Sequence, residues 1–385
     1  MFSSLRNFMN RHRRKFLVSG VVIASGVLAL RYAQRKLIEY QESKAKEFFE
    51  RTRRTQHFES TERTCNQTIM GLAPNLIEKI LKHLNADDIV EQLRHNPDQK
   101  IELWNRVKVL AISRICALVY ACSMLVITLR VQLNILGGYL YKDAVNAEEK
   151  VTVDIQQNYV ALVQYFLNDG CESLCNLIQS KVEHILGGYD LSRKLTLAET
   201  EQIFWSIQMA INSDANDPSN KLATFVFPNE LPACTSNPLY EKMFNETIDM
   251  LESTDTAALN ANNVSRGFSV VMDNIADFYF KPINGSNATK CMENGISSAK
   301  DSPKITELND QPESDSVLPN ISTVSIPLPK LIPIINGLAK QTFSNTTKPP
   351  SLSTSLVTLY LISDKVKVLG ANVYEVFCQC VSIGG

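Results

Sequence analysis

The sequence has almost no excess charge of either sign. Its 39 lysines and arginines balance 40 aspartates and glutamates, so the formal net charge is −1 at pH 7 and the pI is about 6.5. A nucleic-acid-binding domain normally shows a basic patch and a high pI, so this balance argues against that function. Enzyme motifs are missing as well: there is no Gly-x-Ser-x-Gly elbow, Walker loop or dinucleotide fingerprint. We therefore expect no enzyme, no small-molecule substrate and no nucleic-acid partner.

Metal-ligand spacings are also lacking. None of the five histidines pairs with another at a spacing that a metal would need. Cys171 and Cys175 are four residues apart, and Cys378 and Cys380 are two apart, but neither has the second pair that completes a zinc site. The nine cysteines follow no repeating frame, which suits a reducing compartment better than a disulfide scaffold. We interpret both pairs as structural and expect no metal and no cofactor.

An apolar run near the N-terminus is flanked by basic residues. Residues 1–15 form a short basic segment, and FLVSGVVIASGVLAL (16–30) is followed by RYAQRK. The run suits either a cleaved signal peptide or an uncleaved anchor extended by the next few residues. No clear cleavage site precedes a mature start, so we favour a transmembrane anchor over 16–33, whose orientation the flanking charges do not settle. The apolar side chains of this anchor are Phe16, Leu17, Val18, Val21, Val22, Ile23, Val27, Leu28 and Leu30.

The next segment, 34–56, predicts a highly charged juxtamembrane helix with a thin apolar stripe. Leu37, Ile38, Phe48 and Phe49 contribute to this stripe. Basic residues beside a membrane can contact anionic lipid. An ordinary solvated helix face is an equally good interpretation.

Residues 100–138 are the stretch around which the rest of the chain is organised. No residue from Ile115 to Leu129 is charged, and a helix that is apolar all round must be buried in protein or in lipid. The uncharged part has about 15 residues, fewer than the ~20 of a spanning helix. We therefore predict the central helix of a soluble helical domain rather than a second membrane span. We expect this helix to stop at Gly137-Gly138.

The first turns of this helix are amphipathic. Helical spacing brings the following residues to one face, with Ile101 at its edge: Lys100, Trp104, Val107, Lys108 and Ala111. A short helix that carries Leu93 and Arg94 ends just before Lys100, so the two elements could form the walls of one groove. An aromatic residue between lysines suits an acidic amphipathic helix. From spacing alone, the simpler interpretation that Trp104 is the first core residue is favoured.

The remaining chain also favours helices. An apolar stripe of Leu72, Leu76, Ile80 and Leu84 predicts one helix, and further helices are expected within 151–186, 191–212 and 239–280. Residues 281–320 are polar and predicted to be disordered, and 321–337 should form an irregular segment and a short helix. A final helix is expected from 355 to 380, interrupted near Gly370, and no convincing strands are found. The fold class is therefore all-α: one large elongated bundle around a long central helix, over 57–380, preceded by the N-terminal transmembrane helix.

Several strings of the sequence resemble the peroxin-3 family. They are HFESTERTCNQT (57–68), LRVQLNILGGYLY (129–141), NETIDMLES (245–253), SRGFSVVMDNIADF (265–278), TVSIPLPKLIPIING (323–337) and ANVYEVF (371–377). The basic–apolar–basic N-terminus is also similar. The resemblance runs in consistent order from about residue 1 to residue 378.

This resemblance implies a single-pass protein of the peroxisomal membrane, which can pass through the endoplasmic reticulum, with its helical domain in the cytosol. Family members dock the import receptor and chaperone peroxisomal biogenesis factor 19, which brings newly made membrane-protein cargo. The receptor inserts an N-terminal amphipathic helix into a groove of the domain. The family's groove tryptophan corresponds to Trp104, its lysine to Lys100 and its leucine to Leu93. A further groove leucine is replaced here by the smaller Val107, so the resemblance implies a weaker contact at that position.

Two other functions remain open from the sequence. The chain could be a membrane tether for organelle inheritance or turnover factors, using other surface patches. It could also bind membrane lipid directly through an apolar groove.

Overall fold

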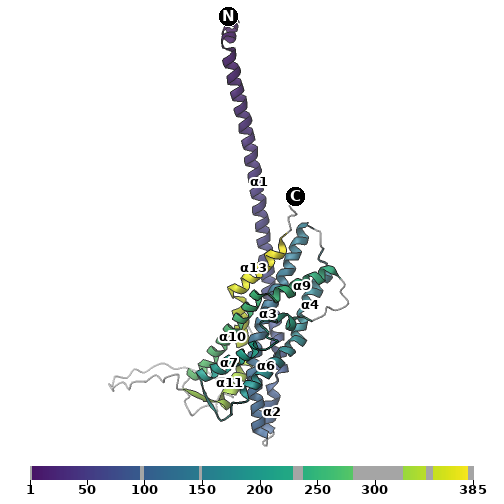
Figure 1. Cartoon of the computed structure of the whole chain (residues 1–385), viewed down its shortest axis with the longest axis vertical. Helices are drawn as coiled ribbons and strands as arrows, with labels where there is room; N and C mark the ends of the chain where they lie inside the picture. Colours follow the sequence, from purple (N-terminus) through teal and green to yellow (C-terminus); the bar gives the residue numbers. More distant parts are fainter. Residues whose placement is uncertain are drawn as a thin grey trace, which may run out of the picture. The chain divides into compact units, whose positions relative to one another are not determined.

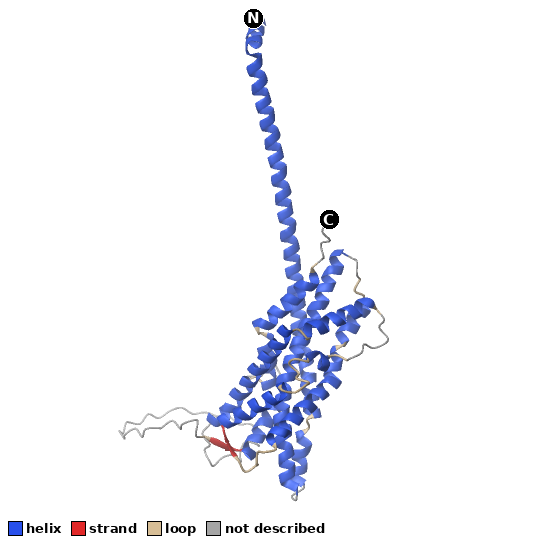
Figure 2. Ribbon diagram, viewed as in Figure 1, coloured by secondary structure: helices blue, strands red, loops and turns tan. Residues whose placement is uncertain are grey.

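The computed structural model describes residues 2–95, 99–146, 150–228, 237–280, 324–343 and 350–379, with side chains from residue 25 onward except that of Asn146. Almost every described segment is helical, which confirms the predicted all-α class (Figure 2). The chain divides into two compact units, Met1–Ser60 and Thr61–Gly385. The predicted anchor side chains from Phe16 to Ile23 and the predicted disordered segment 281–320 lie outside the described residues.

The first unit consists of most of helix α1 (Phe2–His83). Its described side chains are exposed throughout residues 25–51. They include apolar ones, because Val27, Leu28 and Leu30 are 49%, 67% and 64% exposed. Helix α1 contains the segment 34–56, which was predicted as a charged helix. It also contains most of the segment with an apolar stripe that was predicted as a separate helix. In the second unit, this stripe buries Leu76 and Ile80.

The second unit is built around α3 (Lys100–Asn146). Helices α2 (Ala86–His95), α6 (Cys171–Leu186), α10 (Thr254–Phe280), α11 (Leu328–Lys340), α12 (Leu352–Leu361) and α13 (Asp364–Cys378) all pack against it (Figure 1). From Lys100 to Val145 the helix is apolar and long enough to cross a membrane, yet 94% of its most apolar stretch is buried inside the protein. The prediction of a central helix is therefore confirmed.

Shorter helices complete the unit. They are α4 (Val153–Ala161), α5 (Val163–Tyr165), the π-helix η2 (Phe166–Gly170), α7 (Leu197–Asn212), α8 (Leu222–Val226) and α9 (Pro238–Leu251). Local sequence explains several of their starts. Thr196 and Glu199 form a reciprocal capping box before α7, and Asn237 accepts hydrogen bonds from the first backbone amides of α9.

The prediction that the central helix stops at Gly137-Gly138 is wrong. Helix α3 continues for about two further turns, to Asn146. A Cβ atom on Gly137 would lie 2.7 Å from Cγ2 of Thr61, and one on Gly138 would lie 2.7 Å from Cβ of Phe377. These glycines therefore let α1 and α13 approach α3 closely. Gly187, in contrast, does follow the last turn of α6 as its C-cap residue.

The predicted interruption near Gly370 is also wrong. The last helical region breaks at Ile362 and Ser363, between α12 and α13, and Gly370 lies inside α13. A Cβ atom there would be 2.7 Å from Cδ of the buried Arg130. The glycine is required by close packing, so it does not end the helix.

A small sheet was missed by the sequence analysis. Strand β1 (Lys194–Thr196) pairs antiparallel with β2 (Ser325–Pro327), and Leu195 lies opposite Ile326 (Figure 2, red). Three residues are too few to show the alternating pattern by which strands are predicted. The sheet joins the residues that precede α7 to those that precede α11.

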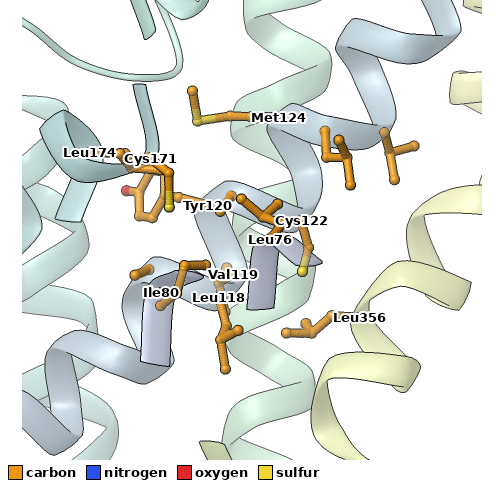
Figure 3. Close-up of a cluster of buried hydrophobic side chains, with 14 of the residues drawn as sticks. Leu76, Ile80, Leu118, Val119, Tyr120, Cys122, Met124, Cys171, Leu174 and Leu356 are labelled. Atoms are coloured by element: carbon orange, nitrogen blue, oxygen red, sulfur yellow. The ribbon is translucent and has the colours of Figure 1, made fainter. Parts of the chain in front are cut away.

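The core surrounds α3 on every side. Figure 3 shows one cluster in which side chains of α3 meet those of α1, α6 and α12. The labelled members, all buried, are Leu76, Ile80, Leu118, Val119, Tyr120, Cys122, Met124, Cys171, Leu174 and Leu356. Every residue from Ile115 to Leu129 is fully buried, so this part of the helix is covered on all sides.

Candidate docking site

The candidate site lies where α2 ends and α3 begins. Asn85 starts α2 as its cap: its side-chain oxygen accepts hydrogen bonds from the backbone amides of Asp87 (3.1 Å) and Asp88 (3.4 Å). These two acidic residues also stand in the first turn, where the helix dipole favours negative charge. Helix α2 packs on α3 and buries Ala86 and Ile89. The predicted pair of adjacent helices is therefore present.

The apolar residues predicted for the groove differ in exposure. Val107 is buried, whereas Leu93 of α2 and Trp104 of α3 are half-buried and pack against the core with one side. Ile101 is 75% exposed. Trp104 therefore contributes to the core and to the surface at the same time. It satisfies the simpler interpretation, a core residue, and still presents an aromatic surface.

The charged residues separate into two kinds. Arg94 and Lys100 are exposed. Lys108 is only 3% exposed, and its ammonium donates hydrogen bonds to the backbone oxygens of Leu186 (3.2 Å) and Tyr189 (2.7 Å). Burial lowers the pKa of Lys108, and the charge of Asp190 acts in the opposite direction. Lys108 thus satisfies carbonyl groups at the end of α6, a favourable place for a cation, and is not a free surface charge.

A surface groove of about 1280 Å³ lies along the first turns of α3. One wall carries the predicted residues Lys100, Ile101 and Lys108. The opposite wall comes from the end of α6 and the following turn, with Gln179, Glu183, Leu186, Gly187, Gly188, Tyr189, Asp190 and Leu191. Leu93, Arg94, Trp104 and Val107 do not line it. The groove therefore does not bring the seven predicted residues together, because three of them line it and four do not.

Sequence reasoning missed the wall formed by residues 179–191. Its only visible signal was Gly187-Gly188, which was interpreted as a helix stop. Within the described ranges, no group of three or more His, Cys, Asp or Glu residues lies close enough to hold a metal ion. Cys171 and Cys175 of α6 are buried thiols, and a hydrogen bond between them, together with burial, raises the pKa of Cys175 well above its usual value.

Comparison with known proteins gives consistent matches along the whole chain. The family model described as Peroxin-3 matches residues 7–100, 94–147 and 140–374. Peroxisomal biogenesis factor 3 of Bos taurus is 35% identical over 397 residues, and that of Homo sapiens is 34% identical over 399; each match covers 98% of both chains. Peroxisome biogenesis protein 3-1 of Arabidopsis thaliana is 26% identical over 234 residues, which is 54% of this chain and 65% of the plant protein.

Proposed function

Because the chain belongs to the peroxin-3 family, whose relatives are named for peroxisome biogenesis, we propose that it is a docking receptor in the peroxisomal membrane. Its partner is peroxisomal biogenesis factor 19, which arrives with membrane-protein cargo and presents an amphipathic N-terminal helix. The observation that carries the proposal is the half-buried Trp104, with Leu93 on the neighbouring helix and Lys100 exposed one turn before it. A fixed aromatic surface beside an exposed cation suits an acidic amphipathic helix.

The proposed mechanism is recruitment without a chemical step. Residues 16–33 anchor the chain in the bilayer, and the helical domain remains in the cytosol. Exposed Val27, Leu28 and Leu30 on α1 support the anchor, since such side chains favour a hydrocarbon environment over water. With anchor and docking site in one chain, a cytosolic receptor–cargo complex becomes a membrane-bound one.

Vesicle recruitment tests this proposal directly. The full chain is reconstituted into phosphatidylcholine vesicles, and a labelled peptide of the receptor's N-terminal helix is added before flotation. We expect the peptide to float with the vesicles, whereas a scrambled peptide of the same composition stays in solution. Failure of the native peptide to float with a correctly folded chain would contradict the docking role. A membrane tether or a lipid-binding protein would then be the better interpretation.

Replacing Lys100 by alanine should weaken peptide binding in a salt-dependent way. Lys100 is exposed, so its charge acts from the edge of the site, where one ion pair changes affinity by about threefold at low salt. The difference from the wild type should shrink at about 0.5 M salt, because screening shortens the range of the interaction. Titrations at both salt concentrations measure it. Lys365→Ala, an exposed lysine on α13, is the matched control, and an equal loss there would contradict a role of Lys100 in the site.

A further inference from the structure

The turn between α1 and α2 is held by a buried arginine of α3. The side chain of Arg114 is fully buried. Its Nε donates to the backbone oxygen of Leu84 (2.6 Å), and its Nη2 donates to that of Leu81 (3.1 Å). Leu81 lies in the last turn of α1 and Leu84 directly follows the helix, where the helix itself supplies no donors for these carbonyls. Arg114 therefore fixes the point from which α2 starts.

The same guanidinium joins α2 to α11. Its Nη1 donates to Oδ1 of Asn336 (2.8 Å), and its Nη2 lies 3.3 Å from Oδ2 of Asp87. The other carboxylate oxygen of Asp87 accepts a hydrogen bond from Nζ of Lys340 (2.9 Å), at the end of α11. One carboxylate in the first turn of α2 is thus shared by a buried cation of α3 and a half-exposed cation of α11. We call Asp87, Arg114 and Lys340 the α2 clamp.

The charge state of Asp87 keeps the α2 clamp closed at neutral pH. Burial alone would raise the pKa of Asp87, but the hydrogen bond from Lys340 and the charges of Arg114 and Lys340 outweigh it and lower the pKa below its usual 3.8. A carboxyl group with a lowered pKa in the folded state loses its stabilising effect only as the pH falls through that lowered value. The clamp is therefore intact throughout the physiological range.

Helix α2 depends on such support. It has ten residues, from Ala86 to His95, and helices of that length are marginal without tertiary contacts. It buries only Ala86 and Ile89. Its later turns carry Leu93 and Arg94, two of the residues predicted to contact the receptor. Any loosening of the first turn therefore displaces Leu93 and Arg94 while the core around α3 stays in place.

We infer that Asp87 and Lys340 are positioning residues for the docking site: through the α2 clamp, helix α11 holds α2 in the place where its outer turns meet the bound peptide. The inference rests on the proposed function, because it concerns the same site. Neither residue is among those predicted to contact the receptor. Without these ion pairs α2 rests in a shifted position, and the peptide must supply the free energy that returns it, which lowers the affinity.

Hydrogen exchange tests the clamp without any partner. In the full chain in detergent micelles, Lys340→Met should raise the exchange rates of α2 amides about threefold, the effect of losing one half-exposed ion pair. Asp87→Asn should raise them about tenfold, because it weakens both ionic contacts and removes a charge from the first turn. The matched control is Lys330→Met, an exposed lysine on the same helix α11. Exchange within α3 should not change in any variant.

Peptide affinity then tests the positioning role. Binding of the labelled receptor peptide should weaken about threefold in Lys340→Met and about tenfold in Asp87→Asn, and Lys340→Arg should restore most of the loss. In about 1 M salt the wild type and Lys340→Met should converge, which a purely steric role of the side chain would not produce.

Three other results would each contradict the inference, and each of them points to a different reason. If Lys340→Met and Lys330→Met give the same α2 exchange, Asp87 and Lys340 do not hold α2. If α2 exchange rises while affinity is unchanged, the clamp stabilises the helix but does not position it for binding. If the wild-type chain binds no peptide while the exchange results hold, the proposed function fails, and the positioning role fails with it.

Discussion

Replacing Trp104 by alanine should weaken binding of the receptor's N-terminal peptide by at least about thirtyfold, which corresponds to about 2 kcal/mol. The side chain is half-buried, so its position is fixed by the core before the peptide arrives. An aromatic group that is already ordered loses little conformational entropy on binding, which is why tryptophan so often dominates an interface. Fluorescence anisotropy of the labelled peptide, titrated with the full chain in detergent micelles, gives the dissociation constant.

The chain contains a natural control for this experiment. Of its two tryptophans, the other is Trp205, which is 55% exposed on α7. Trp205→Ala removes the same chemical group from a surface outside the candidate site and should leave the affinity within about twofold, as surface changes usually do. Circular dichroism must show that both variants are folded. Equal losses of affinity in the two folded variants would rule out Trp104 as the centre of the site.

Replacing Glu62 by alanine should cost about 3 kcal/mol of stability, because it leaves a buried charge without its partner. Glu62 of α1 forms an ion pair with Arg130 of α3, whose side chain is fully buried. Arg130 also donates to Oδ1 of Asn66 (2.8 Å), and the amide of Asn134 donates to Glu62 (3.2 Å). For a unit of this size we expect the thermal midpoint to fall by roughly 5 °C, measured by circular dichroism.

Two further variants show whether the buried charge is the cause. Glu59→Ala removes an exposed carboxylate from the same helix and should change stability by no more than about 0.5 kcal/mol. The double variant with Glu62→Leu and Arg130→Met removes both charges and should be more stable than Glu62→Ala alone, since no unpaired charge remains. A double variant as unstable as Glu62→Ala would show that packing dominates over charge at this position.

The central helix could be predicted because its information is local. Fifteen residues from Ile115 to Leu129 carry no charge, and a helix that is apolar on every side has to be buried. The two wrong predictions, that glycines end or interrupt a helix, arise because the relevant information is not local. A glycine that ends a helix and one that allows close packing look the same in the sequence. The nearest neighbour of Gly138 is Phe377 and that of Gly370 is Arg130, each more than two hundred residues away in the sequence.

In the candidate site, too, local features can be predicted from the sequence and contacts with distant segments cannot. Lys100, Trp104 and Val107 lie at the beginning of α3, next to a short helix that carries Leu93, and their joint role as a contact face stays a prediction. Helical spacing also grouped Lys108 with them, but this side chain is covered by the end of α6, and it donates to Leu186, 78 residues further along the chain. The wall formed by residues 179–191 could not be predicted for the same reason. It depends on which distant helix packs against α3, and one sequence carries no direct record of that.

The burial of α3 has a consequence for synthesis of the chain. The helix ends at Asn146, whereas α13, which packs closely against it, ends only at Cys378. At roughly 5–20 residues per second, the ribosome needs on the order of tens of seconds to produce the remaining cover. During that interval a helix apolar enough to cross a membrane is only partly covered. The nascent chain therefore needs protection by chaperones, or else it offers this helix to the insertion machinery as an incorrect membrane span.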